Sequence, residues 1–205
     1  MIKINRWCQW KIVASLFVLL SMHKLHAQNI DLDILKGINP TNPSSAFWKT
    51  TSGSAYFVCA ATPVYFLTAG IITNSPALRR KAVHVFGAIV VELVVSESMK
   101  DIFKRKRPGE SYPGIIFPYS NASGRSFPSG HTSLAFATAA SVAIQCKKWY
   151  ITVPAYAYAA CVGYSRMYLG VHYPSDVLAG AAVGIGSAYL SHWLTKKLFG
   201  TSKMR

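Results

Sequence analysis

Residues 128–146 read PSGHTSLAFATAASVAIQC. After the tetrapeptide Pro128-Ser129-Gly130-His131 this stretch holds no Asp, Glu, Lys or Arg, so residues 131–146 can form an apolar helix. Four other apolar segments flank it, at residues 54–73, 82–99, 149–164 and 176–194. Several of them approach the roughly 20 residues that cross the hydrocarbon core of a bilayer. The sequence therefore predicts an all-α protein, an integral membrane helical bundle of five to six transmembrane helices.

The composition also favours a membrane protein. Of the 205 residues, 51% are hydrophobic and 14% are charged, and the mean hydropathy is +0.25. A soluble domain carries about a quarter charged residues. The formal net charge of +15 could indicate nucleic-acid binding, but the basic residues gather at the ends of apolar segments and not along one polar face. We therefore expect a bilayer, and no nucleic acid, around this chain.

The amino-terminal end is typical of a secretory leader. Three basic residues precede an apolar stretch at residues 12–22, and the sequence Leu-His-Ala ends at Ala27. The stretch is short for a crossing of about 20 residues. Residues 1–27 are therefore expected to be a signal peptide cleaved after Ala27 or a retained anchor, and residues 28–205 a single membrane-embedded domain.

The first part of that domain, residues 28–53, is a polar lead-in. Pro40 and Pro43 should interrupt any long helix there. The apolar side chains within residues 30–35 can lie along a membrane surface. The lead-in is thus expected at the interface between bilayer and water.

Basic connectors predict how the bundle is oriented. Arg79-Arg80-Lys81, Lys147-Lys148 and Lys196-Lys197 fall on one side if the five segments alternate, and the positive-inside rule makes that side cytoplasmic. The basic run at residues 104–107 falls on the other side, where a site for an anionic substrate has its own need for cations. We expect a multi-pass protein of a bacterial cytoplasmic (inner) membrane, with its site facing the periplasm or exterior.

Two features inside the apolar segments concern packing and charge. Gly180 and Gly184 lie four residues apart, and small residues at this spacing let helices approach closely in lipid. Glu92 and Glu97 are costly in an apolar helix and often mark function. Glu97 can pair with Lys100 three residues further on, which favours a structural role for it.

Three basic side chains are candidates for holding phosphate: Lys100, Arg107 and Arg166. The transition state of phosphoryl transfer spreads negative charge over three equatorial oxygens, which fixed cations and amides must meet. Arginine suits this task because its planar fork can hold two phosphate oxygens. A lone arginine near a membrane face, by contrast, usually anchors a lipid headgroup.

The tetrapeptide that opens the apolar segment adds a second element. Exposed amides at the start of the helix can face the phosphate, and Gly130 lets the backbone come close. His131 would stand beside the leaving oxygen as a general acid. The alternative is a helix cap followed by an interfacial histidine.

His172 and Asp176 form a third element. A carboxylate one helical turn away can hold one imidazole nitrogen and leave the other free to attack phosphorus. Asp176 would also stabilise the charged intermediate. The alternative is that Asp176 only complements the dipole of the last helix.

The three clusters resemble the three-part signature of the type 2 phosphatidic acid phosphatase superfamily: Lys100-x6-Arg107-Pro108, Pro128-Ser129-Gly130-His131 and Ser165-Arg166-x5-His172-x3-Asp176. The resemblance implies a helical bundle and a metal-independent phosphatase. It makes His172 the nucleophile, His131 the general acid and then the activator of water, and Asp176 the residue that orients His172. It makes five residues the phosphate cradle: Lys100, Arg107, Ser129, Gly130 and Arg166.

Members of that superfamily act on phosphatidate, phosphatidylglycerophosphate, undecaprenyl diphosphate, lipid A or sugar phosphates, and some are soluble vanadate haloperoxidases. The apolar segments argue against the last group. A lipid phosphate is therefore the expected substrate, with undecaprenyl diphosphate and lipid A fitting an external site about equally. We expect no cofactor and no metal, because the sequence contains no carboxylate cluster suited to magnesium. The alternative is a non-catalytic protein that binds or transports lipid phosphates.

Overall fold

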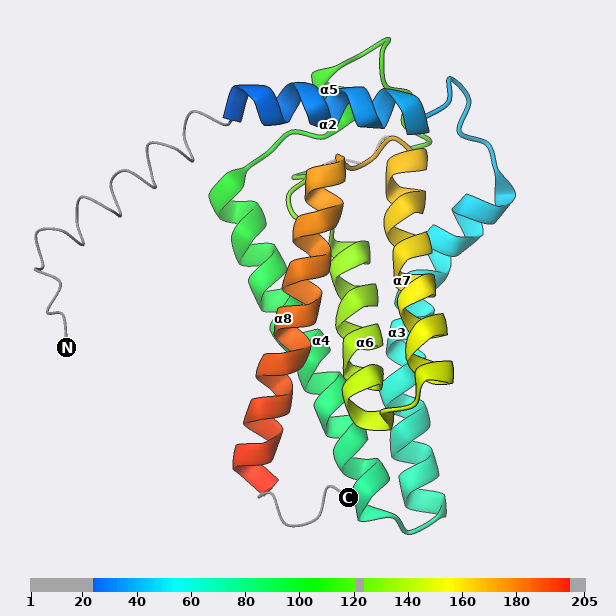
Figure 1. Cartoon of the computed structure of the whole chain (residues 1–205), viewed down its shortest axis with the longest axis vertical. Helices are drawn as coiled ribbons and strands as arrows, with labels where there is room; N and C mark the ends of the chain where they lie inside the picture. Colours follow the sequence, from blue (N-terminus) through cyan, green and yellow to red (C-terminus); the bar gives the residue numbers. More distant parts are fainter. Residues whose placement is uncertain (1–23, 121–123, 200–205) are drawn as a thin grey trace, which may run out of the picture.

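The computed structural model describes residues 24–120 and 124–199, and in these residues it contains helices and no strand. Five long helices run along the long axis of the molecule, while α2 lies across one end of the bundle (Figure 1). The helices are α2 (Lys24–Ile38), α3 (Ala46–Ile72), α4 (Pro76–Phe103), α5 (Pro108–Ser111), α6 (Gly130–Cys146), α7 (Trp149–Tyr168) and α8 (Pro174–Phe199). The predicted all-α class is confirmed.

Each predicted apolar segment is a helix, and four of the five helices continue well into the flanking polar residues. α4 illustrates why. Ser75 caps its start by accepting a hydrogen bond from the backbone N–H of Leu78 at 3.4 Å, and Pro76 occupies the first turn, where its missing N–H costs nothing. The basic residues 79–81 therefore belong to the first turns of α4 and not to a loop.

α6 is the central helix, because it packs against all four of the other long helices. Its buried residues are mostly Ala, Ser and Thr, whose small side chains allow close approach. A Cβ atom added to Gly184 of α8 would lie 2.2 Å from the backbone oxygen of Ser133, and one added to Gly180 would lie 2.7 Å from that of Ser129. The predicted small-residue contact is thus the contact between α8 and α6.

The outer surface of the bundle is apolar. Phe57, Ile72, Phe86 and Leu178 are each more than 60% exposed, which suits contact with lipid chains. Among the described residues, three helical stretches are long and apolar enough to cross a membrane: Ala46–Ile72, Pro76–Ser111 and Pro174–Phe199. α6 has 17 residues and faces its neighbours more than lipid. The count of five to six spanning helices is therefore approximate.

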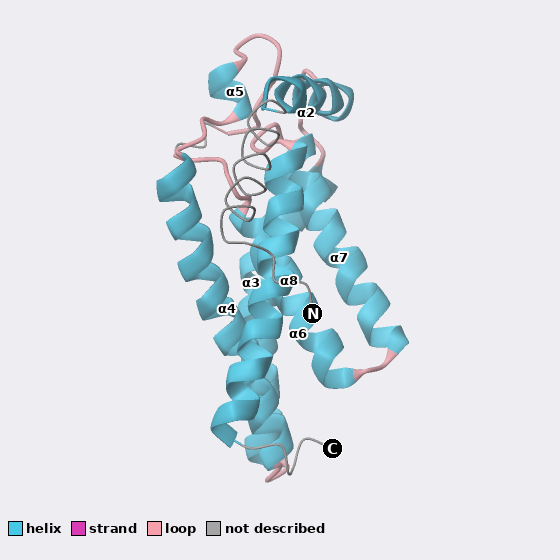
Figure 2. Ribbon diagram, turned by 60° about the vertical axis from the view of Figure 1, so that its left-hand side comes forward, coloured by secondary structure: helices cyan, strands magenta, loops and turns pink. Residues whose placement is uncertain are grey.

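The three basic connectors lie at one end of the bundle, as the alternation of segments predicts. The α3–α4 connection, the α6–α7 connection and the end of α8 all lie at the lower end in Figure 1. The opposite end of the bundle, beneath α2 and α5, contains the helix ends near which the predicted site residues stand (Figure 2).

The lead-in is more helical than its polarity suggests. α2 extends to Ile38 and stops before Pro40, and Pro43 lies in the turn that precedes α3, so the prolines interrupt the chain as expected. The fully buried Leu35 packs against Ile116 and Tyr173. The predicted leader lies mostly outside the described residues and stays a prediction.

Candidate active site

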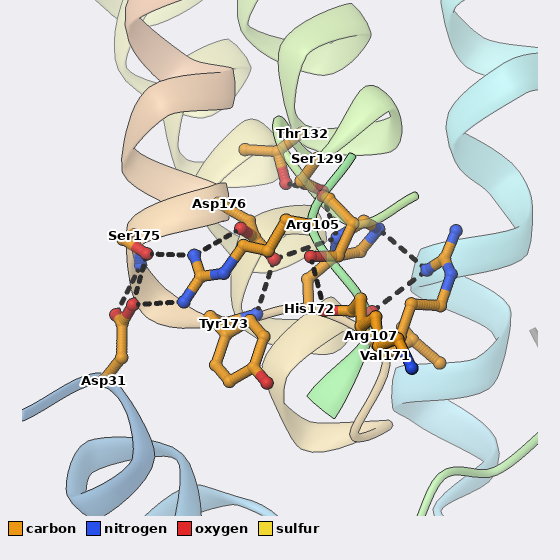
Figure 3. A network of polar contacts seen from close by, with 12 residues as sticks. Asp31, Arg105, Arg107, Ser129, Thr132, Val171, His172, Tyr173, Ser175 and Asp176 are labelled. Atoms are coloured by element: carbon orange, nitrogen blue, oxygen red, sulfur yellow. Dashed lines mark hydrogen bonds and ion pairs between the residues drawn. The ribbon is translucent and has the colours of Figure 1, made fainter. Parts of the chain in front are cut away.

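The sequence-predicted site residues come from five segments that meet at the α2 end of the bundle. Figure 3 labels four of them: Arg107, Ser129, His172 and Asp176. Lys100 lies in the last turn of α4, Arg107 precedes α5, and residues 129–131 open α6. Arg166 lies in the last turn of α7, and Asp176 lies in the first turn of α8.

His172 lies in the turn between α7 and α8 and is 2% exposed. Its Nε2 lies 3.3 Å from Nη1 of Arg107. Because an arginine can only donate, Nε2 is the acceptor and carries no proton. Nδ1 therefore holds the proton and donates it to the backbone oxygen of Ser126 at 2.9 Å. These contacts leave the lone pair of Nε2 directed toward Arg107, where a phosphorus atom could be attacked.

The protonation state of His172 follows from its surroundings. Burial lowers the pKa of His172 to about 4; the neighbouring Arg166 and Arg107 act in the same direction, and Asp176 opposes them. The imidazole is therefore neutral at neutral pH. A neutral imidazole is the form that can act as a nucleophile.

Asp176 is fully buried, and each of its two oxygens has a partner. Oδ1 accepts from Nη1 of Arg105 at 2.8 Å, and Oδ2 accepts from the backbone N–H of Tyr173 at 2.9 Å. Oδ2 also lies 3.5 Å from Nδ1 of His172. The expected pair is thus brought together, but Ser126 is the nearer acceptor for the imidazole. These named partners give Asp176 more than a dipole-complementing role.

The two signature arginines are each held by protein groups at Nη1. Nη1 of Arg107 donates to the backbone oxygen of Val171 at 3.0 Å, and Nη1 of Arg166 donates to Oγ of Ser52 at 2.5 Å. The Nε groups of both arginines are buried and find no hydrogen-bond partner among the described residues. Buried donors of this kind are costly unless an acceptor is supplied. A phosphate oxygen is an acceptor of the right charge.

Lys100 and the start of α6 lie beside these arginines. A Cβ atom on Gly130 would lie 3.4 Å from Nζ of Lys100, so the ammonium group of Lys100 lies next to Gly130. Nζ also contacts Oε1 of Glu97 at 2.7 Å, which confirms the predicted pair. Ser129 occupies the N-cap position of α6 without capping it, because its hydroxyl pairs with Oγ1 of Thr132 at 2.9 Å.

His131 lies in the first turn of α6 and packs against the ring of Tyr56 from α3. The two ring centroids are 4.4 Å apart with an interplanar angle of 62°. His131 is within electrostatic reach of Lys100, Arg166 and His172. Both histidines therefore lie among the same cationic side chains.

Four site residues escape the sequence analysis. Arg105 is part of the basic run expected to meet an anionic headgroup, yet its guanidinium turns inward to Asp176. Asp31 in α2 pairs with Arg105, Ser52 in α3 pairs with Arg166, and Ser126 supplies a backbone oxygen. None carries a local sequence signal, because each partner lies 46 or more positions away.

Known proteins share both the sequence pattern and the fold. The model of the PAP2 superfamily matches residues 81–199. The chain is 33% identical over 141 residues to "Bacitracin transport permease protein BcrC" of Bacillus licheniformis, covering 66% of this chain and 68% of that protein. It is 30% identical over 159 residues to "Putative undecaprenyl-diphosphatase YbjG" of Escherichia coli, covering 77% and 79%.

A solved structure agrees with these matches. The crystal structure of Aquifex aeolicus LpxE superposes with a TM-score of 0.64 at 28% identity, covering 79% of this chain and 94% of that one. The family model spans more than half of the chain, and it contains the three clusters from which the resemblance was drawn. The chain belongs to the PAP2 superfamily and is a membrane hydrolase of phosphate esters.

Proposed function

We propose that the protein hydrolyses a phosphate monoester or diphosphate of a lipid, through a phosphohistidine intermediate on His172, at the external face of the cytoplasmic membrane. The observation that carries the proposal is a pair of buried Nε donors, those of Arg107 and Arg166, which lie beside a neutral His172 and have no partner in the part of the chain that the structure describes. Together these groups provide what an anionic phosphoryl group needs: charge neutralisation and a nucleophile.

The first step transfers the phosphoryl group to the enzyme. Nε2 of His172 attacks phosphorus, an N–P bond forms, and the P–O bond to the lipid breaks. Arg107 releases Nε2 and donates to the phosphate instead. His131 gives its proton to the leaving oxygen, so that the lipid departs as an alcohol or, from a diphosphate, as a monophosphate.

The second step returns the enzyme to its starting state. His131, now neutral, takes a proton from water as that water attacks the phosphohistidine. The N–P bond breaks, inorganic phosphate leaves, and His172 recovers its neutral form with the proton on Nδ1. Asp176 and the oxygen of Ser126 keep that proton in place throughout, because both lie on the Nδ1 side of the ring.

The proposed mechanism needs no metal. In many phosphoryl-transfer enzymes Mg²⁺ neutralises the phosphate, but here Lys100, Arg107 and Arg166 supply positive charge from three separate segments. We expect phosphate release to proceed in EDTA. Loss of activity in EDTA that magnesium restores would contradict this part of the proposal.

The lipid class is proposed from the setting of the site. It lies at the end of an apolar bundle, where the phosphate of a membrane lipid would be found. A relative that is 30% identical is named a putative undecaprenyl-diphosphatase, which supports undecaprenyl diphosphate. Lipid A and phosphatidyl phosphates present the same terminal phosphate, and the assay below ranks all of them.

A second candidate function is binding or transport of a lipid phosphate without catalysis. The observation in its favour is the name of one relative, a bacitracin transport permease. A binder requires the cations but has no use for a neutral nucleophile with a fixed tautomer. The two functions differ in one measurable respect, which is the release of inorganic phosphate.

The experiment measures phosphate release by detergent-purified protein in EDTA. The substrates are undecaprenyl diphosphate, lipid A, phosphatidic acid and phosphatidylglycerophosphate. We expect turnover on at least one of them, complete loss of it in His172→Ala, and retention of it in the control variant His192→Ala, which alters the opposite end of α8. Wild-type protein that binds these lipids without releasing phosphate would favour the binder.

A further inference from the structure

Arg105 differs from the two signature arginines in how its guanidinium is used. Nη1 donates to Oδ1 of Asp176 at 2.8 Å and to Oγ of Ser175 at 2.6 Å, and Nη2 donates to Oδ2 of Asp31 at 2.8 Å (Figure 3). Its carbon Cζ lies 3.8 Å from the ring centroid of Tyr173. Protein groups therefore occupy most of the hydrogen-bond donors of this guanidinium, and few donors remain for a substrate.

This contact fixes how the carboxylate of Asp176 is turned. With Oδ1 held by Arg105, the other oxygen, Oδ2, faces the backbone of Tyr173 and Nδ1 of His172. Without the guanidinium, a fully buried carboxylate would lose its only cationic side chain within ion-pair distance among the described residues. A buried ion left unpaired in this way reorganises or takes up a proton.

Asp31 holds Arg105 from the other side. It lies in α2, it is 7% exposed, and it accepts from Nη2 of Arg105 and from the backbone N–H of Ser175 at 2.9 Å. The hydroxyl of Ser175 bonds to the same carboxylate. Asp31 therefore ties both Arg105 and the start of α8 to a helix that lies outside the bundle.

We infer that Arg105 is a positioning residue for the carboxylate of Asp176, and that Asp31 of α2 in turn holds the guanidinium of Arg105 in place. The inference rests on the proposed function, since its effect is on turnover through His172. A planar guanidinium is needed because it binds two carboxylates at once, that of Asp176 through Nη1 and that of Asp31 through Nη2. Lysine offers a single ammonium and can meet only one of them well.

The test compares kcat, KM and the inhibition constant of inorganic phosphate in Arg105→Gln, Arg105→Lys and Asp31→Asn. We expect Arg105→Gln to lower kcat by about 10- to 100-fold, the loss that follows when a catalytic group is misplaced by about 1 Å. Arg105→Lys should recover part of that loss, and Asp31→Asn should lower kcat less. KM and phosphate inhibition should stay near wild type, because the phosphate cradle is intact.

Two comparisons separate positioning from general damage. Asp33→Asn is the matched control, since Asp33 lies on the same helix as Asp31 and its side chain is 73% exposed. It should behave as wild type. The double variant Arg105→Gln with Asp31→Asn should lose no more activity than Arg105→Gln alone, because Asp31 acts through Arg105.

The inference is overturned if Arg105→Gln keeps wild-type kcat, whether or not phosphate binding weakens in that variant. If Arg105→Gln fails to fold, Asp31→Asn decides, and wild-type kcat in that variant overturns the inference. Failure of the proposed function would appear differently, as absence of turnover in the wild-type protein itself.

Discussion

Replacement of Gly184 by alanine should lower the catalytic rate, although Gly184 lies in the contact between α8 and α6 and not in the site. The added Cβ would lie 2.2 Å from the backbone oxygen of Ser133 and 2.7 Å from the backbone nitrogen of Ala137. An ordinary contact begins at 3.4 Å, so about 1.2 Å of room is missing on the side of Ser133. Both of these atoms are backbone, so no side-chain rotation can relieve the clash and α8 must move away from α6.

The displacement reaches the site because α6 and α8 are bonded there. The N–H of Ser129 donates to the backbone oxygen of Asp176 at 3.0 Å, and Ser129 lies one helical turn from Ser133. A shift of about 1 Å between the phosphate cradle and the nucleophile costs roughly 100-fold in rate. Overpacking of this kind also costs about 1–3 kcal/mol of stability. We expect Gly184→Ala to show both effects.

The assay measures kcat for phosphate release together with the thermal unfolding midpoint in detergent. Gly186→Ala is the control, since it adds the same methyl group to the same helix and meets nothing within 4 Å. It should keep wild-type activity and unfold no earlier, because alanine favours the helix over glycine. Gly184→Ala that matched Gly186→Ala in both measurements would refute the argument that α8 and α6 cannot separate without cost.

Two further predictions concern protonation and orientation. Because burial lowers the pKa of His172 to about 4 from the usual 6.5, the unfolded chain takes up a proton at a higher pH than the folded protein does. The stability that depends on neutral His172 is therefore present above pH 6.5 and is lost as the pH falls toward 4. The unfolding midpoint of the wild type should drop relative to His172→Gln over that window, and parallel curves would contradict the assignment. For orientation, with the four native cysteines replaced by serine, Lys106→Cys should react with a membrane-impermeant maleimide in intact spheroplasts, whereas Lys148→Cys should react only after lysis. The reverse pattern would place the site on the cytoplasmic side.

The sequence could predict those parts of the structure that depend on local signals. Apolar segments of sufficient length became helices, and Glu97 found Lys100 because three residues on a helix bring side chains together. The signature residues assembled as one site, since they lie at or near the ends of α4, α6, α7 and α8, which the segment pattern already implied. Helix ends were less accurate, because caps such as Ser75 extend a helix beyond its apolar part.

The missed features all depend on contacts between distant parts of the chain. Arg105 and Asp31 are 74 positions apart, and nothing in a basic run indicates which of its members turns inward. The oxygen of Ser126 acts as backbone, so its residue type gives no clue. The sequence predicts only a polar, interfacial lead-in where α2 lies. The position of α2 over the site follows from the burial of Leu35 against Ile116, which only the folded chain reveals.

The placement of α2 and α3 also bears on what can be transplanted from this protein. The region matched by the family model begins at residue 81, so a graft of residues 81–199 would carry every signature residue. It would leave behind Asp31, Ser52 and Tyr56, the neighbours of Arg105, Arg166 and His131. A transplant that keeps these three contacts therefore has to be larger than the family region and to include the chain from α2 onward.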